Sequence, residues 1–125
     1  MNAALLVAGG VAVASGVFHI YAGERRIFAR MRPDGLPHTH LGDGVITRRL
    51  LRAISHLLGV SWFGAAAIFF ALSETPLDGD GEVAVRIVAT TFALYAAVAL
   101  LGFGFRHPGW PLLSAVAVAA WVSTI

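Results

Sequence analysis

The sequence predicts an all-α integral membrane protein with four transmembrane helices, and three observations support this fold class. Hydrophobic residues make up 58% of the 125 residues and charged residues only 13%, whereas soluble domains are about 45–50% apolar and about 25% charged. The apolar residues form four long runs, which charged segments separate. The runs are rich in Ala and Leu and lack period-two alternation, which favours helices over strands. The length fits one domain, residues 1–125.

The four runs define the predicted helices in order. Residues 3–22 contain no Asp, Glu, Lys or Arg, and no positive charge precedes them, so we expect a retained helix rather than a cleaved signal peptide. Residues 50–72 and 83–103 each have the length of roughly 20 residues that crosses about 30 Å of hydrocarbon. The fourth run, residues 108–125, is shorter and would reach about 27 Å as a helix.

Charges are unequally distributed over the connecting segments. Segment 23–49 holds six of the nine arginines, whereas segment 73–82 holds four carboxylates and no arginine. The positive-inside rule therefore places loops 23–49 and 104–107 in the cytoplasm and both termini on the outer side of the inner membrane. We expect the arginine-rich loop to contact anionic lipid. No nucleic-acid-binding motif occurs, so the basic charge does not indicate a nucleic-acid partner.

A ridge of small residues runs along the first helix, where Ala4, Ala8, Ala12 and Gly16 recur at every fourth position. Lipid does not drive helices together, and small residues let their backbones approach closely. We expect this ridge to pack inside the four-helix bundle. The alternative is that it faces a second copy of the chain or a larger membrane complex.

All five histidines fall on the predicted cytoplasmic side. His19 lies near the end of the first helix and His56 near the start of the second, so the two are expected at similar depth in the apolar zone. His107 precedes the fourth helix on the same side, and His38 and His40 lie in the long loop, which can fold over the others. Ionisable residues inside a membrane are rare and usually mark function.

Arginines accompany the two embedded histidines. Arg26 shares a helix face with His19, seven residues earlier. Arg52 and Arg49 share a face with His56, at four and seven residues. Each of the first two helices therefore presents a histidine inside the membrane with arginine at the interface, which suits an anionic or polar ligand group.

Three ligand classes fit this pattern. In the first, His19 and His56 ligate a haem and the arginines bind its propionates. The second is a non-haem metal ion. Its candidate ligands are His19, His56, His107, Glu24, His38 and His40. Glu24 lies about 140° around an α-helix from His19, so it joins the group only if the helix unwinds at Gly23. The third is an anion or quinone-like headgroup, with histidine as proton donor.

The sequence predicts no particular reaction, because no catalytic motif is present. The leading hypothesis is a small polytopic membrane protein with a cytoplasmic-side histidine site. The alternative is a non-catalytic accessory subunit that packs against a larger membrane complex. Histidines can also simply hydrogen-bond a neighbouring helix. Inward-facing, mutually close histidines would favour the site, and an outward-facing ridge on the first helix would favour the accessory role. Order within segment 33–47 is not predicted.

Overall fold

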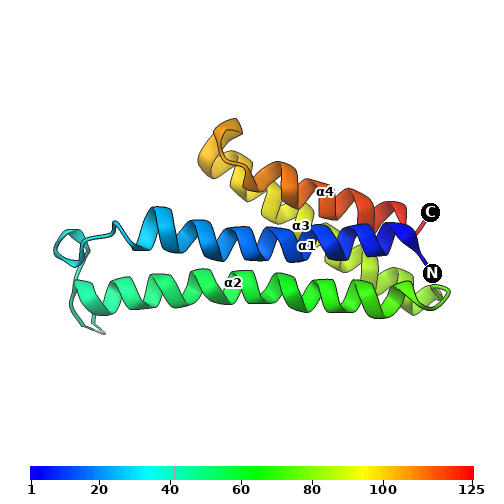
Figure 1. Cartoon of the computed structure of the whole chain (residues 1–125), viewed down its shortest axis with the longest axis horizontal. Coiled ribbons are helices and arrows are strands. Elements are labelled where there is room, and N and C mark those ends of the chain that lie inside the picture. Colours follow the sequence, from blue (N-terminus) through cyan, green and yellow to red (C-terminus); the bar gives the residue numbers. More distant parts are fainter. Residues whose placement is uncertain (41) are drawn as a thin grey trace.

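The computed structural model describes residues 1–40 and 42–125, and over these ranges the chain is all-helical, as predicted (Figure 1). The four α-helices are α1 (Ala3–Ala22), α2 (Gly44–Ser73), α3 (Gly79–Phe103) and α4 (Gly109–Val122). Three short helical turns flank them: the π-helical turn η1 (Gly23–Phe28) and the 3-10 turns η2 (Pro33–Gly35) and η3 (Gly104–Arg106). Three helices, α1 with η1, α2, and α3 with η3, are long and apolar enough to span a membrane, which indicates a membrane protein.

The second and third helices begin earlier than predicted. α2 begins at Gly44 rather than residue 50, because the carboxylate of Asp43 accepts hydrogen bonds of 3.0 and 3.2 Å from two backbone N–H groups of the first turn. α3 begins at Gly79 rather than residue 83, and the carboxylate of Asp78 caps it in the same way. Such caps satisfy N–H groups that have no partner within the helix. The loop after η1 is correspondingly short.

The fourth helix is shorter than predicted. α4 covers 14 residues, about 21 Å at 1.5 Å per residue, whereas the hydrocarbon core is about 30 Å thick. It is therefore not one of the candidate spans. The last three residues leave the helix in a turn.

The helices pack in the order α2, α1, α4, α3. α1 lies between α2 and α4, and α3 packs mainly against α4 (Figure 1). Both chain ends lie at the same end of the molecule, where the Asn2 side-chain amide donates a 3.2 Å hydrogen bond to the Ser123 carbonyl. The other atom of that amide, Oδ1, caps the N-terminus of α1.

The small-residue ridge of α1 packs inside the chain, as predicted. Ala8 and Ala12 are fully buried. At Gly16, an added Cβ would lie 2.6 Å from the Phe63 ring and 3.0 Å from the carbonyl oxygen of Gly59. α1 and α2 therefore approach at a distance that only glycine allows at this point. The ridge itself therefore does not face outward.

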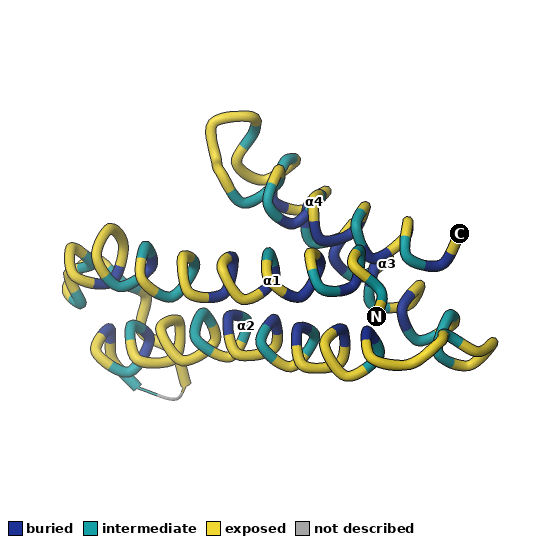
Figure 2. The backbone as a smooth tube through the Cα atoms, turned by 45° about the vertical axis from the view of Figure 1, so that its right-hand side comes forward, coloured by how far each residue is buried: buried dark blue, intermediate teal, exposed yellow. Residues whose placement is uncertain are grey.

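The buried core gathers at the end that holds the termini. Leu5, Phe69, Val85 and Val116, one from each α-helix, are fully buried there, and we call this the closed end. Toward the opposite end, the α3–α4 hairpin turns away from α1 and α2 in both Figure 1 and Figure 2, and its connecting turn is exposed. We call this second region, where residues 15–26 of α1 and η1 face the hairpin, the open end.

Candidate functional site

A cavity of about 410 Å³ lies between the helices at the open end. All four α-helices contribute to its wall, which is mostly apolar. The side chains that bring polar atoms to the wall include His19, Arg26, Ser55, Tyr95 and His107. The volume lies within the range of about 300–1,000 Å³ that is usual for small-molecule sites.

His19 joins α1 to α2 at the cavity. Its Nε2 atom lies 3.2 Å from both the carbonyl oxygen and the hydroxyl oxygen of Ser55. Its ring also packs against the Trp62 indole, with 5.0 Å between ring centroids. These contacts fix the orientation of the imidazole, and the ring forms part of the cavity wall.

Trp62 carries a polar atom without a partner. The residue is only 5% exposed, and its indole Nε1 has no hydrogen bond anywhere in residues 1–40 and 42–125. Its ring packs against Phe92 and Tyr95 of α3, at 6.3 and 6.4 Å between centroids. A buried N–H group without an acceptor costs about 1–3 kcal/mol, and a buried Trp usually finds a partner for it. The indole N–H has almost no accessible surface, so this unused donor lies behind the cavity wall and is not open to the cavity.

His107 enters the cavity wall from the turn before α4. Its Nδ1 atom accepts a 3.0 Å hydrogen bond from the backbone N–H of Gly109, so the imidazole caps the start of the helix. The Phe103 ring stacks on it at 5.0 Å, with 29° between the ring planes.

His56 is engaged elsewhere, in a charged cluster at the α1–α2 contact. Glu24 Oε1 accepts a 2.6 Å hydrogen bond from Arg52 Nε and lies 2.8 Å from His56 Nε2. The second contact is an ion pair when the imidazole is protonated, but its angle does not suit a hydrogen bond. The sequence analysis expected Glu24 to approach the histidines only if the helix unwinds at Gly23, and the helix does change from α to π winding at this residue. However, Glu24 meets His56 and not His19.

The predicted metal site is not assembled. No group of three or more His, Asp and Glu residues close enough to hold a metal ion is found in the described ranges. The six candidates divide among three places: His19 and His107 at the cavity, Glu24 with His56, and His38 with His40 in the loop. His19 and His56 also do not face each other, because His56 follows Ser55 and so points about 100° away around α2.

The expectation that the loop histidines cover the site is wrong. His38 and His40 are exposed. The Thr47 hydroxyl holds their loop at the start of α2 by a 2.8 Å hydrogen bond to the Pro37 carbonyl. Thr47 precedes His56 by nine residues, about 14 Å along the helix, so the loop lies beyond the histidines. Of the predicted arginines, Arg26 lines the cavity, Arg52 pairs with Glu24, and Arg49 is exposed.

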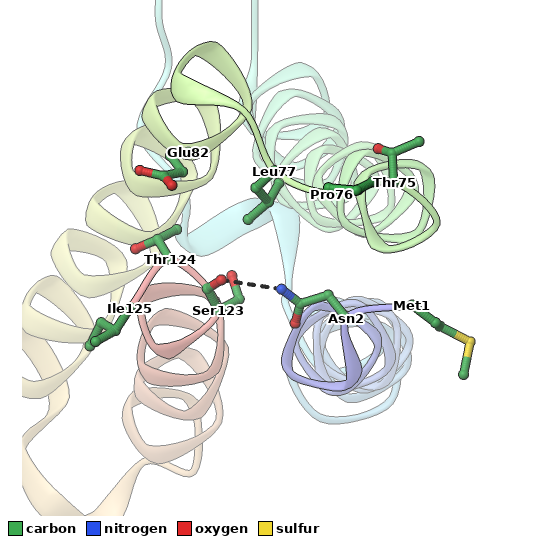
Figure 3. A pocket seen from close by; sticks show the side chains of 9 residues that line it. All are labelled: Met1, Asn2, Thr75, Pro76, Leu77, Glu82, Ser123, Thr124 and Ile125. Carbon is green, nitrogen blue, oxygen red and sulfur yellow. Dashed lines mark hydrogen bonds between the residues drawn. The ribbon is translucent and has the colours of Figure 1, made fainter.

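A second hollow, of about 530 Å³, lies at the closed end between the termini and the α2–α3 loop (Figure 3). The Asn2–Ser123 hydrogen bond crosses it. The Arg86 side chain donates to the Thr124 hydroxyl and carbonyl, both at 3.2 Å, and lies 3.6 Å from Glu82. The Arg86 guanidinium therefore joins the C-terminal end of the chain to α3.

Sequence reasoning missed Trp62, although a signal for it was present. Trp62 follows Gly59 by three residues and Ser55 by seven, so all three share the face of α2 that meets α1.

The chain matches no family model, and comparisons with curated proteins and with solved structures give no match.

Proposed function

We propose that this chain is a polytopic inner-membrane protein that binds a quinone-like ligand, an apolar molecule with a hydrogen-bonding ring headgroup, in the cavity at the open end. One observation carries the proposal: the wall of an apolar cavity of about 410 Å³ brings together the imidazoles of His19 and His107 and the aromatic rings of Trp62, Tyr95 and Phe103.

The lining matches the two parts of such a ligand. Trp62, Tyr95 and Phe103 offer aromatic surfaces for a flat ring, and the imidazoles of His19 and His107 offer polar atoms at its edge. Phe18 and Val98, which also line the cavity, are 39% and 67% exposed. In a bilayer their exposed parts would face lipid, so an apolar tail would extend from the cavity into the membrane.

The proposal includes the topology predicted from the charges. Both termini lie outside, because the short α4 still returns the chain to the end that holds the N-terminus, where Asn2 is hydrogen-bonded to Ser123. The arginine-rich end, formed by segments 23–49 and 104–107, faces the cytoplasm and anionic lipid. The exposed side chains of Arg25, Arg30, Arg32 and Arg49 support this arrangement. The chain has no cysteine, so single cysteines report the topology directly. A membrane-impermeant maleimide should label Thr75→Cys in intact cells and Asp34→Cys only after lysis. The reverse pattern would contradict the orientation.

A pair of matched substitutions tests the ligand site. Ala22 lines the cavity, whereas Ala14 is an exposed α1 residue outside it. Equilibrium dialysis of the detergent-purified protein against a short-chain benzoquinone should show binding to the wild type and to Ala14→Phe, and none to Ala22→Phe, because the added ring fills the cavity. Lack of binding to the wild type would contradict the proposal.

The same preparation separates the other hypotheses. An absorption spectrum with a Soret band, or stoichiometric metal that is lost in His19→Ala, would replace the quinone-like ligand with a haem or metal ion. A colourless, metal-free protein that binds no quinone and co-purifies with larger subunits would instead support the accessory role.

A further inference from the structure

Arg26 brings a permanent positive charge to the wall of the cavity at the open end. The residue is exposed, and its guanidinium makes no hydrogen bond or ion pair with residues 1–40 and 42–125. By contrast, the guanidinium groups of Arg48, Arg52 and Arg86 each donate a hydrogen bond to another residue. Other exposed arginines also lack a partner, but none of them lines the cavity. Arg26 is thus the cation that the cavity wall offers to a ligand.

No carboxylate balances this charge among the described residues that line the cavity. The acidic residue nearest to Arg26 in the sequence is Glu24. Its Oε1 atom lies 2.6 Å from Arg52 Nε and 2.8 Å from His56 Nε2, so it is engaged at the α1–α2 contact. The two imidazoles of the wall can add positive charge but not negative charge. The wall is therefore complementary in charge to an anion.

The positive charge lies on the same helix face as His19. Arg26 follows His19 by seven residues, about 10 Å along an α-helix, and both residues line the cavity. Ala22 and Gly23, which lie between them and also line the cavity, have little or no side chain. A flat ring can therefore lie along this face between the imidazole and the guanidinium. The wall around it is mostly apolar, and a charge-assisted hydrogen bond is stronger there than in water.

We propose that the ligand of this cavity is acidic: a membrane-soluble quinone-like compound with an ionised oxygen on its ring, which Arg26 binds. This inference rests on the proposed function, because it names the charge of the ligand in the same cavity. A hydroxyl group next to a quinone carbonyl has the required chemistry, since its anion shares the charge with a ring carbonyl and forms at neutral pH. The ionised oxygen and the neighbouring carbonyl oxygen lie in the ring plane, and the planar guanidinium can donate to both.

The test compares two probes that differ only in charge. The first is a 2-hydroxy-3-alkyl-1,4-naphthoquinone, which is an anion at neutral pH, and the second is its methyl ether, which is neutral. Equilibrium dialysis against the full chain, purified in a non-ionic detergent, gives both dissociation constants. The wild type should bind the anion about tenfold more tightly than the ether, as expected for a hydrogen bond to a charged group.

Two matched variants assign the preference to Arg26. Arg26→Gln should bind the ether with wild-type affinity, which shows that the cavity is intact, but should lose the preference for the anion. Arg25→Gln removes the same charge from the same turn at a residue that does not line the cavity, so it should keep the preference. Comparing variants cancels any difference in how the two probes partition into the detergent.

The failure of this inference is distinct from the failure of the proposed function. If neither probe binds the wild type, both are wrong. If the ether binds and the anion binds no more tightly, or if the preference persists in Arg26→Gln, the inference is overturned while the ligand site remains. Equal loss of the preference in Arg25→Gln would also overturn it, because the preference would then report the overall charge of the segment.

A lipid headgroup is the other source of an anion at this position. Phosphatidylglycerol added to the dialysis should leave the affinity of the wild type for the anionic probe unchanged. Displacement of the probe by this lipid, but not by phosphatidylcholine, would assign Arg26 to a lipid phosphate and overturn the inference.

Discussion

The closed and open ends of the bundle use the same helices for different purposes. At the closed end each helix buries an apolar side chain completely, and the chain termini are hydrogen-bonded across the helices. At the open end the α3–α4 hairpin turns away from α1 and α2 (Figure 1), and the space between them holds a cavity. Lipid provides no hydrophobic drive for helix association, so close packing must hold such a protein together. The close packing is concentrated at one end, and the other end holds the cavity.

The largest expected effect is at the closed end. Phe69→Ala removes a fully buried ring from the core and should lower the free energy of unfolding by about 3 kcal/mol, because the remaining side chains cannot fill the cavity. Phe105→Ala, at an exposed ring in the η3 turn, should change it by less than about 0.5 kcal/mol. Denaturant titration in detergent measures both. Equal losses would remove the distinction between the two ends.

A smaller effect is expected at the α1–α2 contact, which stays close beside the open end. Gly16→Ala places a Cβ against the Phe63 ring and the Gly59 carbonyl and should cost about 1–2 kcal/mol. Gly10→Ala, in the same helix but with nothing within 4 Å of the added Cβ, should be neutral or stabilise by about 0.5 kcal/mol. The same titration compares them, and destabilisation by Gly10→Ala alone would contradict the packing described here.

The link between the termini should contribute about 1 kcal/mol. Asn2→Ala removes both the cap of α1 and the hydrogen bond to Ser123. Asn2→Asp keeps an acceptor for the cap but loses the donor to Ser123, so its unfolding free energy should fall between wild type and Asn2→Ala. If the aspartate variant is as unstable as the alanine variant, the cap contributes nothing measurable.

The smallest effect is expected at the charged cluster of the open end. The Arg52 and Glu24 side chains are 51% and 30% exposed, and exposed ion pairs contribute about 0–1 kcal/mol. Glu24→Gln should therefore lower the unfolding free energy only slightly at low salt. The difference should disappear near 1 M NaCl, where charge interactions are screened within about 3 Å. A loss that persists at high salt would indicate a packing role for Glu24.

The apolar runs predicted the number and order of the helices. Each run is long enough to form one helix, and charged segments separate the runs. The start of α2 was missed because the charged residues that follow Gly44 resemble a loop. The residue that decides the start of α2 is Asp43, directly before the helix. Its carboxylate accepts two hydrogen bonds from the first turn, and hydropathy does not measure such bonds.

The sequence predicted the level along the helices at which the histidines lie, but not the direction in which their side chains point. His19 contacts Ser55, the residue before His56, so the two histidines do lie at a similar level. Which of them faces the cavity depends on the rotation of each helix about its axis, and the tilt of the α3–α4 hairpin decides that His107 lies nearby. Neither quantity is contained in the spacing of polar residues within one helix.

The π-helical turn accommodates one additional residue at this end of the molecule. In η1 the hydrogen bonds link each residue to the fifth after it, as in the 2.9 Å bond from the Ala29 N–H to the Glu24 carbonyl. This wider turn stacks Phe28 over Gly23 and lets the Phe28 carbonyl accept from Arg48. A π turn amounts to one extra residue in an α-helix. A single-residue deletion among residues 25–27 should therefore restore regular α-helical winding while Phe28 stays over Gly23 and keeps facing α2.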